Sequence, residues 1–378
     1  MKVEEILREL VAIPTPSSNS NLPLLRWVEQ CLKAQQWQVQ LLPYTDENGI
    51  AKANLMARPG HAERNNNSIG LAFICHTDTV PYAASWSTAL KLGESPDGLF
   101  LHGCGACDVK GSLACFLDAV GGLTREKVRP DAAVILTADE EIGCKGMEQL
   151  LGQTHLRIRS ALVSEPTSLR PGVAGKGYGL ARVTIKGIEA HSAYPREGRS
   201  AIHLAARFIT RLENATAQHA MHEDPLFDPP FTTTNVGVIQ GGSAKNIIAG
   251  WCTFLVEWRP VPADLPRATF TQLEQIADEL RGEEPGTGIE VELLRAEQGF
   301  APSEAGALQS QLSKLLGAER TPMGISFSSE ASRLAAVADE VIVIGPGDMH
   351  TAHSERECVP RAELHLWVDT LRELLQAR

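Results

Sequence analysis

Three apolar runs in the first half of the chain end in side chains that can bind a proton or a metal ion. The runs span residues 71–78, 132–141 and 160–166. They end in His76 and Asp78, in the acidic segment 139–141, and in Glu165. Continuous apolar runs of this length are typical of central strands that are covered on both faces of a sheet. In open α/β sheets, binding sites form at the carboxyl ends of the strands. The pattern therefore predicts a site assembled from three strand ends.

The spacing of apolar residues predicts helices and further strands around these three runs. Helices are expected over 2–11, 22–36, 111–123, 145–152, 304–316, 329–338 and 360–376. Strands are expected over 37–44, 51–58 and 340–347. This alternation of helices with buried strands predicts an α/β domain.

The pattern changes in the middle of the chain. Strands are expected over 180–187, 232–242, 252–260 and 288–295, and helices over 200–218 and 269–282. The order β-α-β-β-α-β is that of a ferredoxin-like sandwich. We therefore expect an α/β catalytic domain with a mixed sheet, formed by residues 1–178 and 296–378. An inserted ferredoxin-like α+β domain is expected to span residues 179–295.

Composition and charge exclude several classes of protein. The chain has 378 residues, of which 43% are hydrophobic and 21% charged, and its formal net charge is −11. Nucleic-acid binding requires a basic surface, which this composition does not provide. No apolar stretch is long enough to predict a membrane span, and the acidic N-terminus does not resemble a secretory signal. The eight cysteines are scattered, which is typical of reduced thiols, so we expect a cytoplasmic protein.

Five residues form a candidate set of metal ligands: His76, Asp108, Glu141, Glu165 and His353. Imidazoles and carboxylates suit zinc, cobalt or manganese. One aspartate can bridge two ions, each of which then takes one histidine and one terminal carboxylate, and the pair can activate a shared water. A single histidine after a strand is usually a structural imidazole, but the accompanying acids favour a metal site because they are costly to bury alone.

Two carboxylates near this set have other expected roles. Asp78 can accept a hydrogen bond from the free ring nitrogen of a metal-bound His76, or it can cap the turn before Pro81. Glu140 and Glu141 point in opposite directions on extended chain, so one can bind metal while the other acts as general base. The alternative is a solvated acidic turn.

The glycine-rich stretch HGCGACDVKG (102–111) contains a Cys104-x-x-Cys107 pair beside Asp108. Such a pair can indicate zinc or redox chemistry. Because the chain has no second pair of this kind, we interpret both cysteines as small buried residues.

Several motifs in sequence order resemble those of the dinuclear zinc acyl-amino-acid hydrolases. They are HTDTVP, GCGACDVKG, TADEEIG, SEPTSL, GIEAHSAYPREGRSAI, GGSAKNIIA, WRPVP and GPGDMHTAH. The resemblance covers essentially the whole chain and implies two zinc ions, with cobalt or manganese as substitutes. It assigns His76, Asp108 and Glu165 as ligands, with Asp108 as the bridge, and Glu141 and His353 as the ligands that complete the second site.

The resemblance also assigns residues that bind no metal. It makes Glu140 the general base and gives Asp78 the role of orienting His76. It implies that His191 reaches a partner subunit's site and stabilises the oxyanion, so a homodimer is expected. Asn246 and Arg259 match positions that bind the substrate carboxylate.

The motifs around SEPTSL and around Glu330 are most like the acetylornithine deacetylase branch of the family. This implies removal of an acetyl group from an N-acetylated amino acid, with Glu330 near the distal amine of the substrate. Deacylation of acetylcitrulline or succinyl-diaminopimelate, and a dipeptidase or exopeptidase activity, remain alternatives on the same scaffold. A non-catalytic binding module would be indicated by loss of a ligand or of the base, and neither is lost in this chain.

Overall fold

The computed structural model describes residues 1–62, 68–219, 223–304 and 306–376. The chain forms two compact units. The first comprises Met1–Val173, Pro302–Met323 and Ser329–Arg378, and the second comprises Ala174–Ala301 and Gly324–Ser328. The second unit is longer at both ends than the inserted domain expected from the sequence. The main chain accounts for the difference, because the Gly175 and Lys176 amides donate to the carbonyls of Phe300 and Ile325 at 2.9 and 3.0 Å.

The first unit is built on a mixed sheet. The strands of this sheet are β1 (Trp37–Thr45), β2 (Ala51–Pro59), β3 (Ser68–His76), β6 (Ala132–Thr137), β7 (Arg157–Val163), β8 (Gly172–Gly175), β13 (Met323–Ile325) and β14 (Ala338–Val343). The last two residues of β8 and of β13 are counted with the second unit. The strand order is β1-β2-β6-β3-β7-β14-β8-β13. The four central strands β6, β3, β7 and β14 are parallel to their neighbours within that group, and β1, β2 and β8 pair antiparallel. A small sheet of β4 (Gly93–Glu94), β5 (Phe100–His102) and β15 (Cys358–Pro360) accompanies it.

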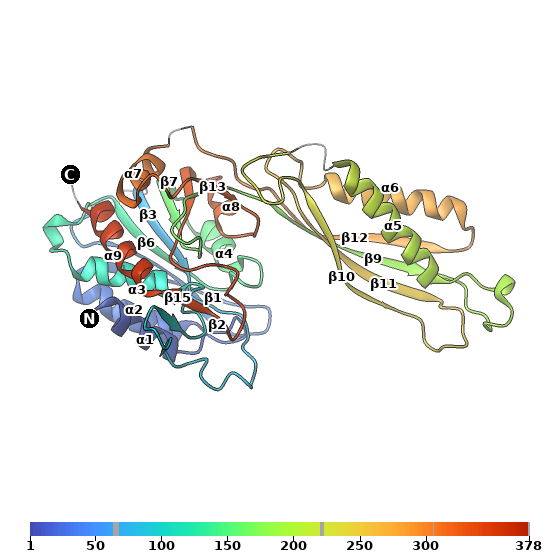
Figure 1. The fold of residues 1–378 in the computed structure, drawn as a ribbon, viewed down its shortest axis with the longest axis horizontal. Helices are drawn as coiled ribbons and strands as arrows, with labels where there is room; N and C mark the ends of the chain where they lie inside the picture. The colour runs from blue at the N-terminus through green and yellow to red at the C-terminus, as the bar shows by residue number, and fades with distance from the viewer. Residues whose placement is uncertain (63–67, 220–222, 305, 377–378) are drawn as a thin grey trace. The chain divides into compact units, whose positions relative to one another are not determined.

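Helices cover this sheet. They are α1 (Val3–Ala12), α2 (Leu22–Ala34), α3 (Lys110–Gly121), α4 (Lys145–Gln153), α7 (Ala307–Leu316), α8 (Ala331–Leu334) and α9 (Arg361–Leu375). Helices α1 and α9 lie on either side of α3 and pack against it (Figure 1). The residues of α3 are buried nearly all round. Phe116 of α3 stacks on Phe73 of β3, with ring centroids 4.5 Å apart. A single hydrophobic core therefore joins α1, α3 and α9 to the central strands.

Helix α8 is shorter than the helix expected over 329–338. It ends at Leu334, and the carbonyl of Val337 already accepts a hydrogen bond from the Ile158 amide at 2.9 Å. Residues 335–337 form a turn, and Ala338 begins β14, because pairing with β7 replaces the helical hydrogen bonds there. The remaining predicted helices of this unit are present, with ends that differ by a few residues.

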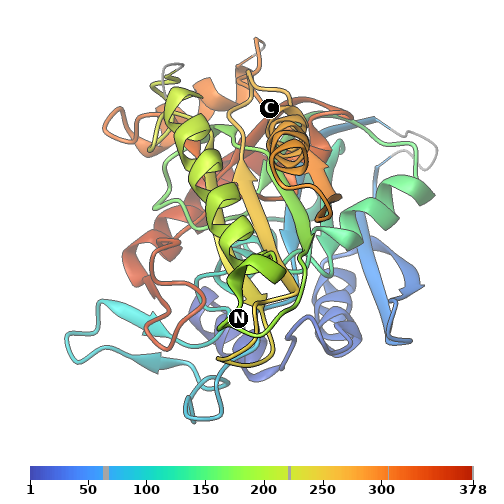
Figure 2. The ribbon, with the colours of Figure 1, turned by 90° about the vertical axis from the view of Figure 1, so that its right-hand side faces the viewer.

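The second unit is a four-stranded sheet with two helices. Its elements are β9 (Tyr178–Lys186), α5 (Ala201–His219), β10 (Thr233–Gly241), β11 (Trp251–Arg259), α6 (Ala268–Glu283) and β12 (Gly288–Glu297). The strand order is β10-β11-β9-β12, and all neighbours are antiparallel. Figure 2 shows α5 and α6 beside each other against the sheet. This is the topology of a ferredoxin-like sandwich.

Buried and more exposed side chains alternate along the strands of the second unit, and the buried ones form its core. Ala181, Val183 and Ile185 of β9 are buried, whereas their neighbours on the same strand are more exposed. Phe208 of α5 meets Phe254 of β11 edge-on, with ring centroids 5.4 Å apart. The predicted fold class, a mixed-sheet α/β domain with an inserted α+β domain, is confirmed. No helix in the described ranges has both the length and the apolar character that crossing a membrane requires.

Candidate metal centre

Three neighbouring strand ends form the floor of the candidate site. Strand β3 lies between β6 and β7 and runs parallel to both, with His76 opposite Thr137 and Ile74 opposite Val163. The residues that follow these strands therefore emerge at one edge of the sheet. This register brings together the ends of the three apolar runs, as the sequence predicted.

Asp108 lies between two histidines that come from distant parts of the chain. Its Oδ1 atom is 3.0 Å from His76 Nε2, and its Oδ2 atom is 3.0 Å from His353 Nε2. Asp108 and His76 are buried, whereas the side chain of His353 is 48% exposed. Each oxygen of one carboxylate thus faces a different imidazole, which is the arrangement expected of a carboxylate that bridges two ions. His350 points elsewhere, since its ring pairs with Asp348 at the surface.

Glu141 joins this group from the segment after β6. Its Oε2 atom is 3.2 Å from His353 Nε2, and its Oε1 atom is buried without a hydrogen-bond partner among the described residues. His76, Asp108 and Glu141 offer ligand atoms that all lie within 4.8 Å of one another. A buried carboxylate oxygen without a partner is costly, and a metal ion would satisfy it. The donor set and this oxygen therefore fit a metal ion.

The charges of the group support the same conclusion. Burial opposes the protonation of His76, but the hydrogen bond with Asp108 and the nearby Asp78 carboxylate raise its pKa well above the usual value. Hydrogen bonds with Asp108 and Glu141 raise the pKa of His353 to about 10. Burial raises the pKa of Asp108, but the two imidazoles outweigh this effect and hold it well below its usual range. In the metal-free protein, protons on the two imidazoles supply the positive charge that the carboxylates require.

Glu140 lies beside the candidate metal ligands, and its own main chain fixes its direction. Its carbonyl accepts hydrogen bonds from the amides of Gly143 and Cys144 at 2.9 Å, and its Oε1 atom lies 3.5 Å from the Cys144 thiol. Burial, reinforced by the charge of Glu141, raises the pKa of Glu140 to about 8, although His76 opposes the shift. A carboxylate with a raised pKa suits a general base, because it both accepts and returns a proton near neutral pH.

Asp78 holds the acidic segment as well as lying beside His76. Its carboxylate accepts the amides of Glu140 and Glu141 at 3.1 and 3.2 Å and the Ser17 hydroxyl at 2.7 Å. The Nδ1 atom of His76 is 3.0 Å from the main-chain carbonyl of Asp78 and 3.7 Å from its carboxylate. The hydrogen bond that orients His76 is therefore made by the Asp78 main chain. This corrects the expectation that the carboxylate makes it, since the carboxylate lies farther from the ring nitrogen than the carbonyl does.

Two more acids from the predicted set are buried in this unit. Glu165, which follows β7, is 3% exposed, and Glu330, just before α8, is 1% exposed. Burial raises the pKa of Glu165 well above its usual value, and the charges of Glu140 and Asp108 add to the effect. Burial also raises the pKa of Glu330 to about 7, and among the described residues its Oε1 atom has no hydrogen-bond partner.

Glu357 is a buried acid that the sequence analysis missed. Its carboxylate accepts the amides of Gly105, Cys107 and Asp108 at 3.0 to 3.1 Å, so it shapes the glycine-rich loop that presents Asp108. The only signal in the sequence is an acid just before a short strand, which is too common to identify it. Cys104 and Cys107 of the same loop are buried free thiols, as predicted.

The remaining three predicted residues belong to the second unit. His191 and Asn246 lie on exposed neighbouring segments, where the Ser192 amide donates to the Asn246 carbonyl at 3.0 Å. Arg259 ends β11, where its guanidinium pairs with Glu257 at 2.8 Å and stacks on the Tyr178 ring at 4.6 Å.

These three residues do not form one cluster within a single chain. Trp251, at the start of β11, pairs with Lys186, and the His191 segment lies beyond that end of the sheet. Arg259 lies at the other end of β11, so the strand alone separates it from His191 by roughly 25 Å at about 3.3 Å per residue. A single copy therefore cannot use both Asn246 and Arg259 on one carboxylate.

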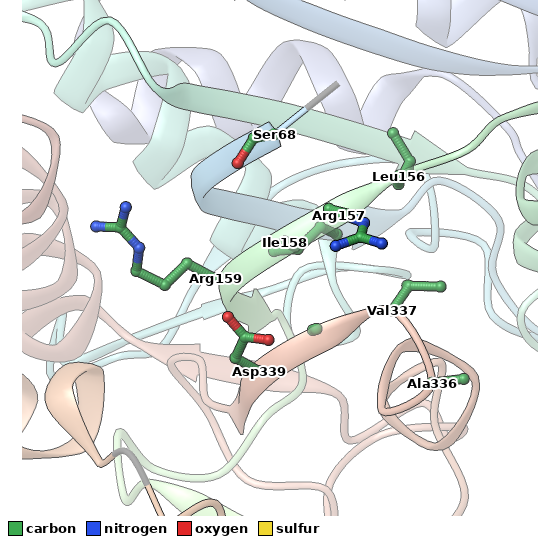
Figure 3. A pocket seen from close by; sticks show the side chains of 9 residues that line it. Ser68, Leu156, Arg157, Ile158, Arg159, Ala336, Val337 and Asp339 are labelled. Atoms are coloured by element: carbon green, nitrogen blue, oxygen red, sulfur yellow. The ribbon is translucent and has the colours of Figure 1, made fainter. Parts of the chain in front are cut away.

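A separate cavity lies at the opposite ends of the central strands. It has a volume of ≈ 540 Å³ and is lined by the starts of β3, β7 and β14, including Ser68, Arg157, Arg159 and Asp339. The guanidinium groups of Arg157 and Arg159 point away from each other (Figure 3). The cavity is thus separate from the His76 and Glu165 ends of the same strands and offers no paired cationic clamp.

Comparison with known proteins places the chain in a family. The profile of Peptidase family M20/M25/M40 matches residues 72–377. An acetylornithine deacetylase from Myxococcus xanthus is 40% identical over 359 residues, which cover 95% of this chain and 92% of that protein. An acetylornithine deacetylase from Yersinia pestis is 31% identical over 383 residues, covering 98% of this chain and 95% of that protein. This chain belongs to Peptidase family M20/M25/M40.

Solved structures agree at the level of the fold. A tripeptidase from Staphylococcus aureus superposes with a TM-score of 0.79 at 21% identity, covering 99% of this chain and 97% of that one. The predictions of the family and of a metal-dependent amide hydrolase are therefore confirmed.

Proposed function

We propose that this protein hydrolyses the acetyl amide of N-acetylornithine and depends on two bound zinc ions, with cobalt or manganese as substitutes. The observation that carries the proposal is the position of Asp108, whose two oxygens each lie 3.0 Å from a different imidazole. The choice of substrate is supported by the 40% identity to an acetylornithine deacetylase. Such an activity belongs to arginine biosynthesis.

The proposed ligands divide between two ions around Asp108. His76 and Glu165 would serve one ion, and Glu141 and His353 the other. Bound zinc would activate a water molecule and polarise the acyl carbonyl. Glu140 takes a proton from a water molecule as the water attacks the carbonyl carbon. It then delivers the proton to the departing amine, so that acetate and ornithine are released.

Two further residues are proposed to select the substrate within this scheme. Arg259 would bind the substrate carboxylate, because a guanidinium fork matches the two oxygens of a carboxylate. Glu330 would face the distal ammonium group of ornithine. Its buried position and the unpartnered Oε1 atom among the described residues support this role, because a buried carboxylate needs a cation or a proton.

A homodimer is part of the proposal. His191 of the partner subunit would stabilise the oxyanion, and Asn246 of the partner subunit would accompany it. The separation of His191 from Arg259 within one sheet supports this arrangement, since both can serve one substrate only if they come from two copies. Strand β10 is an edge strand, and its Val238 and Ile239 are 49% and 51% exposed, which offers an apolar surface for a second copy.

We also propose that the enzyme works in the cytoplasm. None of the eight cysteines, which all lie in the described ranges, forms a disulfide, and six of them are buried. Free thiols throughout a long chain are typical of a reducing compartment.

A substrate panel tests the proposed function. The zinc-loaded protein is given N-acetylornithine, N-acetylcitrulline, succinyl-diaminopimelate and several dipeptides, and the kcat/KM of each is measured. We expect the highest value for N-acetylornithine. A preference for dipeptides would overturn the proposed substrate and make the protein an exopeptidase on the same scaffold.

A further inference from the structure

Two polar side chains of β2 face the segment that carries Glu140 and Glu141. Lys52 and Asn54 are each only 1% exposed. Asn54 accepts the Ala138 amide at 3.3 Å and donates to the Gly146 carbonyl at 2.8 Å, so it ties together the two ends of segment 138–146. Lys52 pairs with Asp139, the residue directly before Glu140.

The Lys52 ammonium reaches a second support of the same segment. It donates to the Ser17 carbonyl at 2.6 Å, and the Ser17 hydroxyl donates to the Asp78 carboxylate at 2.7 Å. That carboxylate accepts the amides of Glu140 and Glu141. One buried cation is therefore connected to Glu140 through Asp139 and also through Ser17 and Asp78.

The conformation of Asp139 makes this support important. Its φ is 59°, in the left-handed region that residues other than glycine seldom adopt. The Tyr44 hydroxyl donates to Asp139 Oδ2 at 2.8 Å, and Lys52 binds the other oxygen. Because Asp139 sets the direction in which the chain leaves β6, fixing its side chain also fixes the direction of Glu140.

We propose that Lys52 is a positioning residue, which holds Asp139 and through it the pair Glu140–Glu141 in the geometry needed for hydrolysis. Lys52 does not touch the reacting atoms in this account. Its contribution to the rate rests on the function proposed above, whereas its effect on the segment 138–146 does not.

The test compares Lys52→Met with Lys145→Met. Lys145 starts α4 beside the same segment, but its side chain is 39% exposed and pairs with Glu47 at the surface. We measure amide hydrogen exchange over residues 139–146, bound zinc, and kcat and KM for N-acetylornithine. For Lys52→Met we expect faster exchange and a kcat roughly 10- to 100-fold lower, the usual effect of removing an outer support, with KM nearly unchanged. Lys145→Met should match the wild type.

Two further variants keep the test decisive if Lys52→Met does not fold. Tyr44→Phe removes only the hydroxyl that binds Asp139, and we expect it to speed exchange and lower kcat by about tenfold or less. Lys52→Met/Asp139→Asn removes both charges of the Lys52–Asp139 pair, while Asp46, which lies 3.5 Å from the Lys52 ammonium, keeps its hydrogen bonds from the Asn48 and Ile50 amides. This double variant should fold with a lowered kcat. The proposal would be overturned if the folded variants showed the same amide hydrogen exchange over residues 139–146 and the same kcat as the wild type. If the wild-type protein hydrolyses no acyl-amino acid, the proposed function fails, and the exchange comparison still decides the role of Lys52.

Discussion

The Nε2 atom of His353 lies 3.0 Å from the Oδ2 atom of Asp108, although 245 residues separate them in the chain. The φ of His353 is 58°, so a left-handed turn aims its ring at the carboxylate. The other Asp108 oxygen faces His76. Asp108 thus connects the two histidines, and Glu141 joins the group through its contact with His353.

Replacing His353 tests this connection against a neighbouring histidine. His353→Asn removes an imidazole that contacts both Asp108 and Glu141. We expect it to lose about one zinc ion per chain and to lower kcat by more than the 10- to 100-fold that is usual for an outer support. His350→Asn is the matched control, because His350 is 94% exposed and contacts only Asp348 among the described residues. Equal zinc content and equal kcat in the two variants would contradict the assignment.

Glu140→Gln tests the general base. The amide keeps the size of the side chain but cannot accept the proton of the attacking water, so kcat should fall by roughly 10²- to 10⁴-fold. Zinc content should not change, because Glu140 is not among the proposed ligands. Glu148→Gln is the control, since Glu148 is 66% exposed in the same part of the chain. Near-normal turnover by Glu140→Gln with both ions bound would refute the mechanism.

Glu330→Gln should change the pH dependence of stability in the metal-free protein. The pKa of Glu330 is raised by burial from 4.5 to about 7. Between these values the folded state keeps a proton that the unfolded state has lost, so the free energy of unfolding falls as pH rises through this window. The glutamine variant carries no such proton. It should therefore gain stability relative to the wild type at pH 8 and lose that advantage below about pH 4.5.

Urea denaturation of the chelator-treated proteins at pH 5 and pH 8 measures this difference. Glu319→Gln, at an exposed position, is the control. A stability difference between Glu330→Gln and the wild type that is the same at both pH values would show that Glu330 does not carry the buried charge.

Mixing two inactive variants tests whether His191 serves a partner's site. His191→Asn lacks the proposed oxyanion donor, and Glu140→Gln lacks the base. In a mixed dimer, one site combines an intact Glu140 with an intact His191 of the partner subunit. An equal mixture that exchanges subunits freely should recover about a quarter of the wild-type activity, because half of the dimers are mixed and each has one complete site. No recovery from subunits shown to exchange would place His191 in its own chain's site or outside the mechanism.

The sequence predicted the parts of this site that depend on local pattern. The apolar runs before His76, before the acids 139–141 and before Glu165 indicate buried strands, and parallel pairing then brings their ends together. The ferredoxin-like order of the second unit could also be predicted, because successive side chains of its strands alternate between the core and the surface.

The supporting contacts could not be predicted in the same way. Glu357 binds amides about 250 positions earlier in the chain, and Lys52 pairs with a carboxylate 87 residues away. Such contacts depend on how strands and loops meet in three dimensions, which spacing does not encode. One signal was available for Lys52. It and Asn54 are polar residues two apart on a strand, which is unusual for a face that turns out to be buried.

Metal reconstitution tests the central claim most directly. The protein is stripped with a chelator and titrated with zinc, and both bound metal and the release of acetate from N-acetylornithine are followed. We predict that the stripped protein is inactive and that activity returns and saturates at two zinc ions per chain. Full activity in the metal-free protein, or zinc binding that leaves the rate of acetate release unchanged, would contradict the account.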